Sequence, residues 1–211
     1  MQILLLTDTH GTFISHETTE WRLEEYPIDL ILIAGDFSYF DQQYERLMEL
    51  VKSSGVPFFF TSGNHESVEF CKNVELLYGG VYLDGAYIRY RELCLAGLCG
   101  HDIFYPNRAN NIVDFQNLQI DMRGTRFSIL LSHEPPRPWL FQGRDCGSLL
   151  VRETIEHHGF DLVVTGHLHT KTPRIETMEQ GTKVINPGTR GAVIELDTTS
   201  GEFEILSPMM D

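Results

Sequence analysis

The sequence predicts an α/β fold, and three observations support this prediction. Short apolar runs distributed along the chain are typical of buried strands. Amphipathic segments with helical spacing lie between several of these runs. Strand and helix alternate through the first half of the chain, which favours a layered α/β arrangement.

Apolar runs predict the strands of this fold. The clearest buried strands are Ile3–Leu6, Leu30–Ala34, Pro57–Phe60, Phe127–Leu131 and Leu162–Val164. Further strand-like stretches are Tyr82–Leu83, Ala86–Tyr90, Leu93–Ala96, Lys183–Ile185, Ala192–Leu196 and Glu202–Leu206. Asp84-Gly85 suits a type I′ turn and predicts a tight hairpin, and Thr198–Gly201 predicts a second hairpin loop.

Helices are expected in four places. The segments are Thr18–Tyr26, Phe40–Val51, Val68–Tyr78 and Ser148–His157. In Phe40–Val51 the apolar residues recur at spacings of three and four, which forms one apolar stripe. Gly159 is a plausible stop for the last helix.

Length and charge limit the class of protein. The chain has 211 residues, of which 42% are hydrophobic, and we expect one domain over residues 1–211 without a sizeable cap domain. The net charge of −14 and the lack of a Lys/Arg cluster argue against long nucleic acid as a partner. Bound cations would still allow an anionic small molecule to enter a pocket.

The compartment is predicted from what the sequence lacks. The apolar start, Met1–Leu6, has neither the basic residues nor the cleavage site of a signal peptide. No apolar run approaches the length of a membrane span. The four cysteines have no C-x-x-C spacing and are expected to be buried or free thiols. We therefore expect a cytoplasmic protein that does not enter membranes.

Polar residues follow five of the apolar runs at the point where each run ends. The segments are Asp8-Thr9-His10, Gly35-Asp36, Gly63-Asn64-His65-Glu66, His133 and Gly166-His167-Leu168-His169. Sites in α/β sheets form just outside the carboxyl ends of the strands. We therefore expect these side chains to converge, although some lie more than a hundred residues apart.

The donor types predict a metal site. The candidate ligands are Asp8, His10, Asp36, Asn64, His133, His167 and His169. Carboxylate, imidazole and amide donors without a thiolate suit Mn, Fe, Zn, Ni or Mg and exclude a structural zinc finger. Seven donors are too many for one tetrahedral ion, but they fit two ions if one carboxylate bridges. Residues two apart on an extended segment point to the same face, so Asp8 and His10 can reach one ion.

Taken in order, these blocks resemble the calcineurin-like metallophosphoesterase superfamily. The pattern of that superfamily is D-x-H, G-D, G-N-H-[ED], an isolated His and G-H-x-H, and all five blocks occur here between residues 8 and 169. The segment Ser132–Pro136 is similar to the small, single-domain phosphodiesterase branch. The resemblance implies a four-layer αββα sandwich of two mixed β-sheets flanked by helices.

The resemblance also implies roles for the residues. One metal would be bound by Asp8, His10, Asp36 and His169, and the other by Asp36, Asn64, His133 and His167, with Asp36 bridging. The metals are two divalent ions, with Mn favoured over Fe, Ni, Zn or Mg. A hydroxide that bridges them would attack phosphorus. His65 would stabilise the developing charge and protonate the leaving oxygen, so His65 and Asp36 are the expected catalytic residues.

One departure bears on the substrate. The protein phosphatases of this superfamily have arginines just after G-D and just before G-N-H-E, whereas Phe37–Phe40 and Thr61–Gly63 contain none here. A dianionic monoester needs more positive charge than a monoanionic diester, so we expect a small phosphodiester or nucleotide as substrate. Arginines 108, 137, 144 and 190 could still approach from other loops.

Alternative functions remain open at this point. They are a phosphomonoesterase or protein phosphatase, a nuclease, and a non-catalytic interaction scaffold with the same fold. The acidic charge opposes a nuclease, and the presence of His65 opposes a scaffold. A homo-oligomer also remains open.

Other residues are expected to have structural roles. His16, His157 and His158 match no block, and His101 has at most a peripheral role. Asn186–Arg190 is expected to be a turn, and Phe58–Phe60 to lie in the core. Trp139–Phe141, in the loop after His133, could line a pocket or an interface.

Overall fold

A computed structural model describes residues 1–100 and 120–206, and two six-stranded mixed sheets form its centre. Sheet A has the order β14-β13-β1-β2-β3-β4 and comprises β14 (Phe203–Ile205), β13 (Ala192–Leu196), β1 (Gln2–Leu6), β2 (Leu30–Ala34), β3 (Phe58–Thr61) and β4 (Val81–Tyr82). Sheet B has the order β11-β12-β10-β7-β6-β5 and comprises β11 (Arg174–Thr177), β12 (Lys183–Asn186), β10 (Leu162–Val164), β7 (Phe127–Ser132), β6 (Leu93–Leu98) and β5 (Ala86–Tyr90). The remaining strands form the small β8–β9 hairpin (Leu140–Phe141 and Arg144–Asp145).

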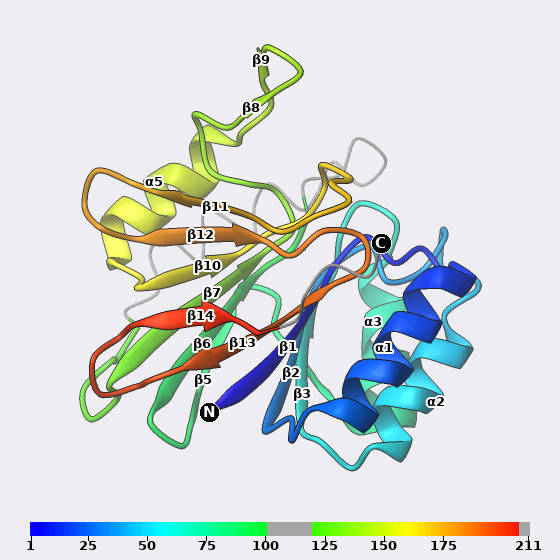
Figure 1. Cartoon of the computed structure of the whole chain (residues 1–211). Coiled ribbons are helices and arrows are strands. Elements are labelled where there is room, and N and C mark those ends of the chain that lie inside the picture. The colour runs from blue at the N-terminus through cyan, green and yellow to red at the C-terminus, as the bar shows by residue number, and fades with distance from the viewer. Residues whose placement is uncertain (101–119, 207–211) are drawn as a thin grey trace.

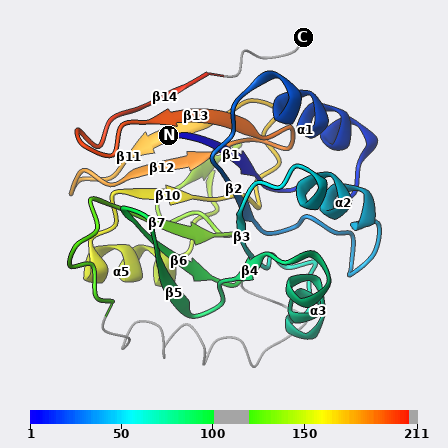
Figure 2. The same cartoon turned by 90° about the horizontal axis from the view of Figure 1, so that it is seen from below.

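Helices cover the outer faces of both sheets. Sheet A is covered by α1 (Phe13–Glu25), α2 (Glu45–Ser53) and α3 (Val68–Tyr78), and sheet B by α5 (Leu149–His158). Figure 1 shows α1–α3 beside β1–β3, and Figure 2 shows the two sheets between their helices. The described residues therefore form the four layers expected from the family resemblance, and the predicted fold class is confirmed.

The central strands are mostly apolar because both of their faces are buried. In β1, Ile3 and Leu5 lie in the core between the two sheets, whereas Leu4 and Leu6 pack on the other face toward the helices. Successive side chains of a strand point to opposite faces. A continuous apolar run is thus what a middle strand of this sandwich requires.

The predicted helices exist, but two of them begin more than one residue away from the predicted start. α3 occupies the expected residues and ends at Gly79 with φ 80°, and α5 ends at Gly159 with φ 75°. α1 begins earlier than predicted, at Phe13, after Thr12 accepts a hydrogen bond from the backbone N–H of Ser15. α2 begins at Glu45 rather than Phe40, because Phe40, Asp41 and Gln43 have φ values of 50°, 61° and 59°, which no α-helix contains.

The hairpin predicted at Asp84-Gly85 is wrong. β4 pairs with β3 in sheet A, whereas β5 pairs with β6 in sheet B, so the turn takes the chain from one sheet to the other. Gly85 does have a positive φ, 63°, as expected of a turn residue. The second predicted hairpin is confirmed, because β13 and β14 pair antiparallel on either side of Thr198–Gly201.

The predictions for the core phenylalanines and the cysteines hold in the described part of the chain. Phe58, Phe59 and Phe60 are buried. Each of the four cysteines is a thiol outside any disulfide, and Cys146 is exposed. In residues 1–100 and 120–206, no helix combines the length and the apolar character needed to cross a membrane.

Candidate active site

All seven predicted metal ligands lie in the described residues and come together at one edge of the two sheets. They follow the carboxyl ends of β1, β2, β3, β7 and β10. The strands β1, β2 and β3 are parallel to one another in sheet A, and β7 is parallel to β10 in sheet B. Parallel strands end on the same side of a sheet, so five distant chain segments meet.

The first donor group contains Asp8, His10, Asp36 and His169. One ligand atom from each lies within 4.8 Å of the others. The Nε2 atoms of His10 and His169 are 3.0 Å apart, and His169 Nε2 is 3.5 Å from Asp8 Oδ1. His169 is half exposed, which leaves this group open to solvent.

The second donor group surrounds the side-chain oxygen of Asn64. Asn64 Oδ1 lies 3.1 Å from His133 Nε2 and 3.0 Å from His167 Nδ1. His133 is fully buried, and its Nε2 is the atom directed at this group.

Asp36 belongs to both groups. Its Oδ2 lies 3.3 Å from His133 Nε2 and 3.7 Å from His10 Nε2. Its Oδ1 accepts a hydrogen bond of 3.0 Å from the backbone N–H of His65. The Asp36 carboxylate therefore links the two donor groups.

The donor set fits divalent metal ions. Ligand atoms bound to one cation at about 2.0–2.2 Å lie roughly 3 to 3.5 Å from each other, and the separations within each group are close to this range. Without a cation, pairs of nitrogen and oxygen atoms at these separations need a proton between them. The residues thus match the N/O chemistry of Mn, Fe, Zn, Ni or Mg.

The electrostatic environment keeps two of the imidazoles uncharged. Burial lowers the pKa of His10 to about 4, and burial together with the nearby His133 lowers the pKa of His167 to about 4. Both side chains are neutral at pH 7, so each has a lone pair for a metal. Burial raises the pKa of the Asp8 carboxyl.

His133 and Asp36 form a charged pair. Burial alone would lower the pKa of His133, but the charge and hydrogen bond of Asp36, with the charge of Asp8, raise this pKa to about 10. Burial opposes ionisation of Asp36 too, yet its contacts with His133 and His65 hold the pKa of that carboxyl well below its usual range. A cation bound here would take the place of the His133 proton.

Backbone carbonyls orient two of the imidazoles from behind. His133 Nδ1 lies 2.9 Å from Ala34 O, and His10 Nδ1 lies 3.2 Å from Ser38 O. An Nδ1–H that donates to a carbonyl leaves Nε2 free for the metal, which is the usual arrangement of ligating histidines.

Glu66 has a structural role that the sequence analysis did not assign. It is fully buried, and its carboxylate accepts hydrogen bonds from the backbone N–H groups of Asp36, Ser38 and Gly63 at 2.9, 2.8 and 2.8 Å. Glu66 therefore fixes the G-D and G-N-H-E loops to each other. Its position in the G-N-H-E block was the only available signal.

Two glycines allow the close contacts of the site. A Cβ on Gly63 would lie 2.0 Å from Asp36 Oδ1, and a Cβ on Gly166 would lie 1.8 Å from Thr7 Oγ1 and 2.8 Å from Asp8 Oδ2. The backbone of each glycine therefore packs directly against the carboxylate of Asp36 or Asp8 or its neighbour.

His65 lies beside the cluster. Its Nε2 is 3.9 Å from Asp36 Oδ2, and its side chain is only 16% exposed. The ring of Phe40 stacks on the imidazole with centroids 4.1 Å apart. Nδ1 is buried and has no hydrogen-bond partner among the described residues.

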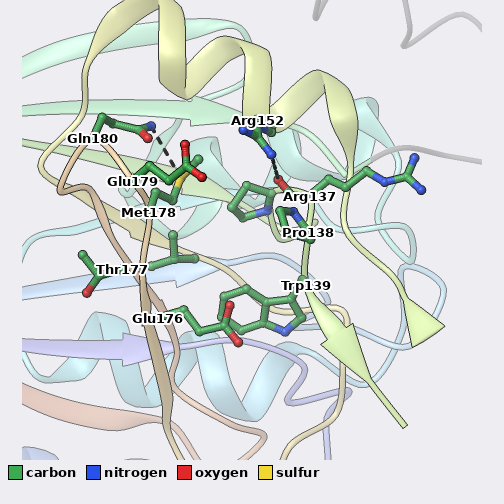
Figure 3. A pocket seen from close by; sticks show the side chains of 11 residues that line it. Arg137, Pro138, Trp139, Arg152, Glu176, Thr177, Met178, Glu179 and Gln180 are labelled. Atoms are coloured by element: carbon green, nitrogen blue, oxygen red, sulfur yellow. Dashed lines mark hydrogen bonds between the residues drawn. The ribbon is translucent and has the colours of Figure 1, made fainter. Parts of the chain in front are cut away.

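The loop after His133 leads away from the donors to a separate pocket. Trp139 is buried and lines a cavity of about 200 Å³ together with Arg137, Met178 and Arg152, as Figure 3 shows. None of the seven donors lines this pocket. Arg137 pairs there with Asp145 at 2.6 Å, and Arg144 is exposed in β9.

The histidines outside the five blocks and the segment Asn186–Arg190 are predicted to be structural. His16 is buried in α1, which fits a packing role, and His157 is exposed on α5. In the predicted turn Asn186–Arg190, Asn186 ends β12 and the following residues lead to β13. The backbone N–H of Thr189 donates there to the carbonyl of Thr170. His101 and Arg108 lie outside the described residues.

The sequence is similar to known metallophosphoesterases. A family model described as calcineurin-like phosphoesterase matches residues 1–171. An uncharacterized metallophosphoesterase of Helicobacter pylori is 27% identical over 186 residues, which include 80% of this chain and 44% of the relative. The chain thus spans less than half the length of the curated relatives that it matches.

Solved structures of low sequence identity have the same fold. A protein from Thermus thermophilus has a TM-score of 0.68 at 17% identity, with 97% of each chain covered. A dimetal phosphatase from Danio rerio has a TM-score of 0.59 at 11% identity, with 92% of each chain covered. An archaeal phosphodiesterase has a TM-score of 0.54 at 16% identity, with 98% of this chain and 99% of that chain covered.

Proposed function

The chain belongs to the calcineurin-like phosphoesterase family, and from this membership we propose that it is a dinuclear metal-dependent phosphodiesterase. Its substrate is a small phosphodiester or nucleotide. The family is metal-dependent, and Asp8, His10, Asp36 and His169 form a candidate metal site in this chain.

The observation that carries the proposal is the position of the Asp36 carboxylate. Its Oδ2 lies between the two donor groups, 3.7 Å from His10 Nε2 and 3.3 Å from His133 Nε2. One carboxylate that contacts both groups is what two neighbouring cations require of a bridging ligand. Asp8, His10 and His169 would complete the first site, and Asn64, His133 and His167 the second.

Two divalent cations at these positions would supply a nucleophile derived from water and would neutralise charge on the phosphate. Mn is the ion we favour. The chain contributes the ligand geometry, since burial and the backbone carbonyls of Ala34 and Ser38 hold the imidazoles in place.

His65 is the proposed general acid. In hydrolysis, an oxygen from water bonds to phosphorus, the bond from phosphorus to the leaving oxygen breaks, and that oxygen takes a proton. His65 lies beside the cluster and is partly exposed, so it can reach a leaving oxygen and donate this proton.

The preference for diesters rests on charge. The segments Phe37–Phe40 and Thr61–Gly63, which flank the ligands Asp36 and Asn64, contain no arginine. A monoanionic diester needs less compensating charge than a dianionic monoester. One structure of the same fold is described as a phosphodiesterase and another as a dimetal phosphatase, so the fold by itself is compatible with both activities.

Hydrolysis of bis-p-nitrophenyl phosphate and of p-nitrophenyl phosphate tests the proposal. The metal-stripped chain is reconstituted with Mn, Ni, Mg or Zn, and bound metal per chain is measured by mass spectrometry. We expect about two ions per chain and faster cleavage of the diester. Asp36→Ala should lose metal and activity together, whereas His65→Ala should keep both ions and lose activity by about 10²–10⁴-fold.

His157→Ala is the matched control, because it removes an exposed histidine from α5. It should change neither the bound metal per chain nor the rate of hydrolysis. Preference for the monoester would contradict the argument from the missing arginines and retain the metal site. Two bound ions without turnover of either ester would point to a scaffold.

A further inference from the structure

Two exposed aromatic rings lie beside His65. Tyr39 and Phe40 are 49% and 48% exposed, although they follow the ligand Asp36 by only a few residues. Phe40 stacks on His65 with centroids 4.1 Å apart and an interplanar angle of 30°. Tyr39 meets Phe40 edge to face at 5.0 Å, and its ring lies 5.5 Å from His65 and 6.5 Å from His10.

The backbone of this loop is held in an unfavourable conformation. Phe40 and Asp41 both have φ in the left-handed region, which residues with a Cβ rarely adopt. The surrounding contacts enforce it. The Asp41 carboxylate accepts hydrogen bonds from the N–H and hydroxyl of Ser67 at 2.8 and 2.7 Å, and the N–H of Asp41 donates to His65 O at 3.2 Å.

The contacts of the loop keep the rings of Tyr39 and Phe40 half exposed. A relaxed loop could turn both side chains toward the apolar core, where aromatic residues of this size gain most from burial. Instead, the loop is tied at Ser38 by Glu66 and at Asp41 by Ser67, with the rings between these ties and half exposed. Strain that the surroundings maintain at a site is typical of a functional position.

The rings lie on the same side of the cluster as the proposed general acid His65. If His65 protonates the leaving oxygen, as proposed above, a group attached to that oxygen lies next to the ring that stacks on His65. Metal ions recognise the phosphate of any ester equally, so the organic part must be recognised by the protein surface around His65. Tyr39 and Phe40 offer that surface planar, apolar faces.

We propose that Tyr39 and Phe40 form a leaving-group subsite that selects phosphodiesters with a planar aromatic ring on the leaving alcohol. The ring is that of an aryl group or of a nucleoside base. This proposal rests on the proposed function, because it takes the position of the leaving oxygen from the role of His65.

Calorimetric binding to the Mn-loaded chain tests the subsite without the need for turnover. Three monoanionic diesters differ only in their organic groups: diphenyl phosphate, the methyl ester of adenosine 5′-monophosphate, and dimethyl phosphate. Stacking of one ring on an aromatic side chain is expected to favour a ring-bearing ester over dimethyl phosphate by about tenfold or more. The first two esters separate an aryl ring from a nucleoside base.

Four variants identify the residues responsible. Phe40→Leu and Tyr39→Ala remove a planar ring and should reduce the preference to within about threefold, while affinity for dimethyl phosphate shows that the metal site is intact. Tyr39→Phe keeps the ring and should keep the preference. Leu76→Ala removes an apolar side chain that is 82% exposed on α3 and serves as the control.

The proposal is overturned if the wild-type chain binds all three esters alike, if it binds none of them, or if the preference survives in both Phe40→Leu and Tyr39→Ala. A preference that depends on these rings without hydrolysis of bis-p-nitrophenyl phosphate would reject the proposed activity and the leaving-group role, and would retain Tyr39 and Phe40 only as the surface that selects planar rings. Diester hydrolysis without a preference for ring-bearing esters would retain the proposed activity and reject the subsite.

Discussion

The imidazole Nδ1 of His133 lies 2.9 Å from the carbonyl oxygen of Ala34. Ala34 is the last residue of β2 in sheet A, and His133 directly follows β7 in sheet B. The contact therefore joins the two sheets at the carboxyl ends of their strands. It also leaves Nε2 of His133 directed at Asp36 and Asn64.

Metal binding is expected to release a proton from His133. In the metal-free chain both ring nitrogens face oxygen acceptors, and the pKa of His133 is raised to about 10, with burial opposed by Asp36. A cation at Nε2 must displace that proton, so apparent metal affinity should rise by about tenfold per pH unit between pH 7 and 9. Calorimetry in two buffers of different ionisation enthalpy measures the released proton.

The raised pKa of His133 also makes the stability of the fold depend on pH. A histidine whose pKa is higher in the folded chain stabilises the fold most below its unfolded pKa of about 6.5, and loses this contribution as pH rises through about 10. Urea unfolding of the metal-free chain should show stability falling from pH 7 to 10, and His133→Gln should weaken this trend. A metal affinity that does not change between pH 7 and 9 would contradict the displacement of a proton from His133.

Glu66→Gln is expected to destabilise the chain by about 2–3 kcal/mol, because an amide cannot accept all the hydrogen bonds that the buried carboxylate receives. Burial and the charge of Asp36 raise the pKa of Glu66 to about 7. The folded chain therefore holds this proton more tightly than the unfolded chain, so the contribution of Glu66 to stability falls as pH rises from about 4.5 to 7. Urea unfolding at several pH values should show this slope in the wild type and lose it in Glu66→Gln.

Gly63→Ala is expected to abolish metal binding. The added Cβ would lie 2.0 Å from Asp36 Oδ1, so the shared carboxylate must move. Gly55→Ala is the matched control, because Gly55 has open space for a Cβ and its φ of 69° makes the substitution strained for the backbone alone. It should cost about 1–2 kcal/mol of stability without loss of metal. Equal metal content in both variants, measured by mass spectrometry, would refute the close-packing argument.

Arg22 is expected to stabilise the chain without affecting the metal site. Its guanidinium is buried at the end of α1 and donates to the carbonyls of Thr18, Arg190 and Gly191. Arg22→Met removes the guanidinium donor from all three carbonyls, of which that of Arg190 keeps the Thr18 hydroxyl as a donor. It should cost about 2–4 kcal/mol in urea unfolding. Arg46→Met, which removes a half-exposed partner of Glu20, should cost less than about 1 kcal/mol. Similar costs in the two variants would contradict the role assigned to burial.

The local sequence determined where strands end and which chemistry follows them. A strand that is buried on both faces is mostly apolar, so its end is visible as a change to polar residues such as Asp8 or His133. The ordered blocks then indicated one shared site, and the structure brings all seven donors together. The N-terminal caps and terminal glycines of α3 and α5 are also local features, and these helices lie where they were expected.

Only the tertiary structure decided which strands pair and what surrounds the ligands. Asp84-Gly85 correctly indicates a turn, but a turn residue does not state whether the next strand stays in the same sheet, and β5 joins sheet B. The loop before α2 is non-helical because Glu66 and Ser67 hold Ser38 and Asp41 from another part of the chain. The positions of Tyr39 and Phe40 beside His65 follow from those contacts. Pairing, hydrogen bonds to buried carboxylates and strained backbone all depend on residues distant in sequence, and local periodicity contains no information on them.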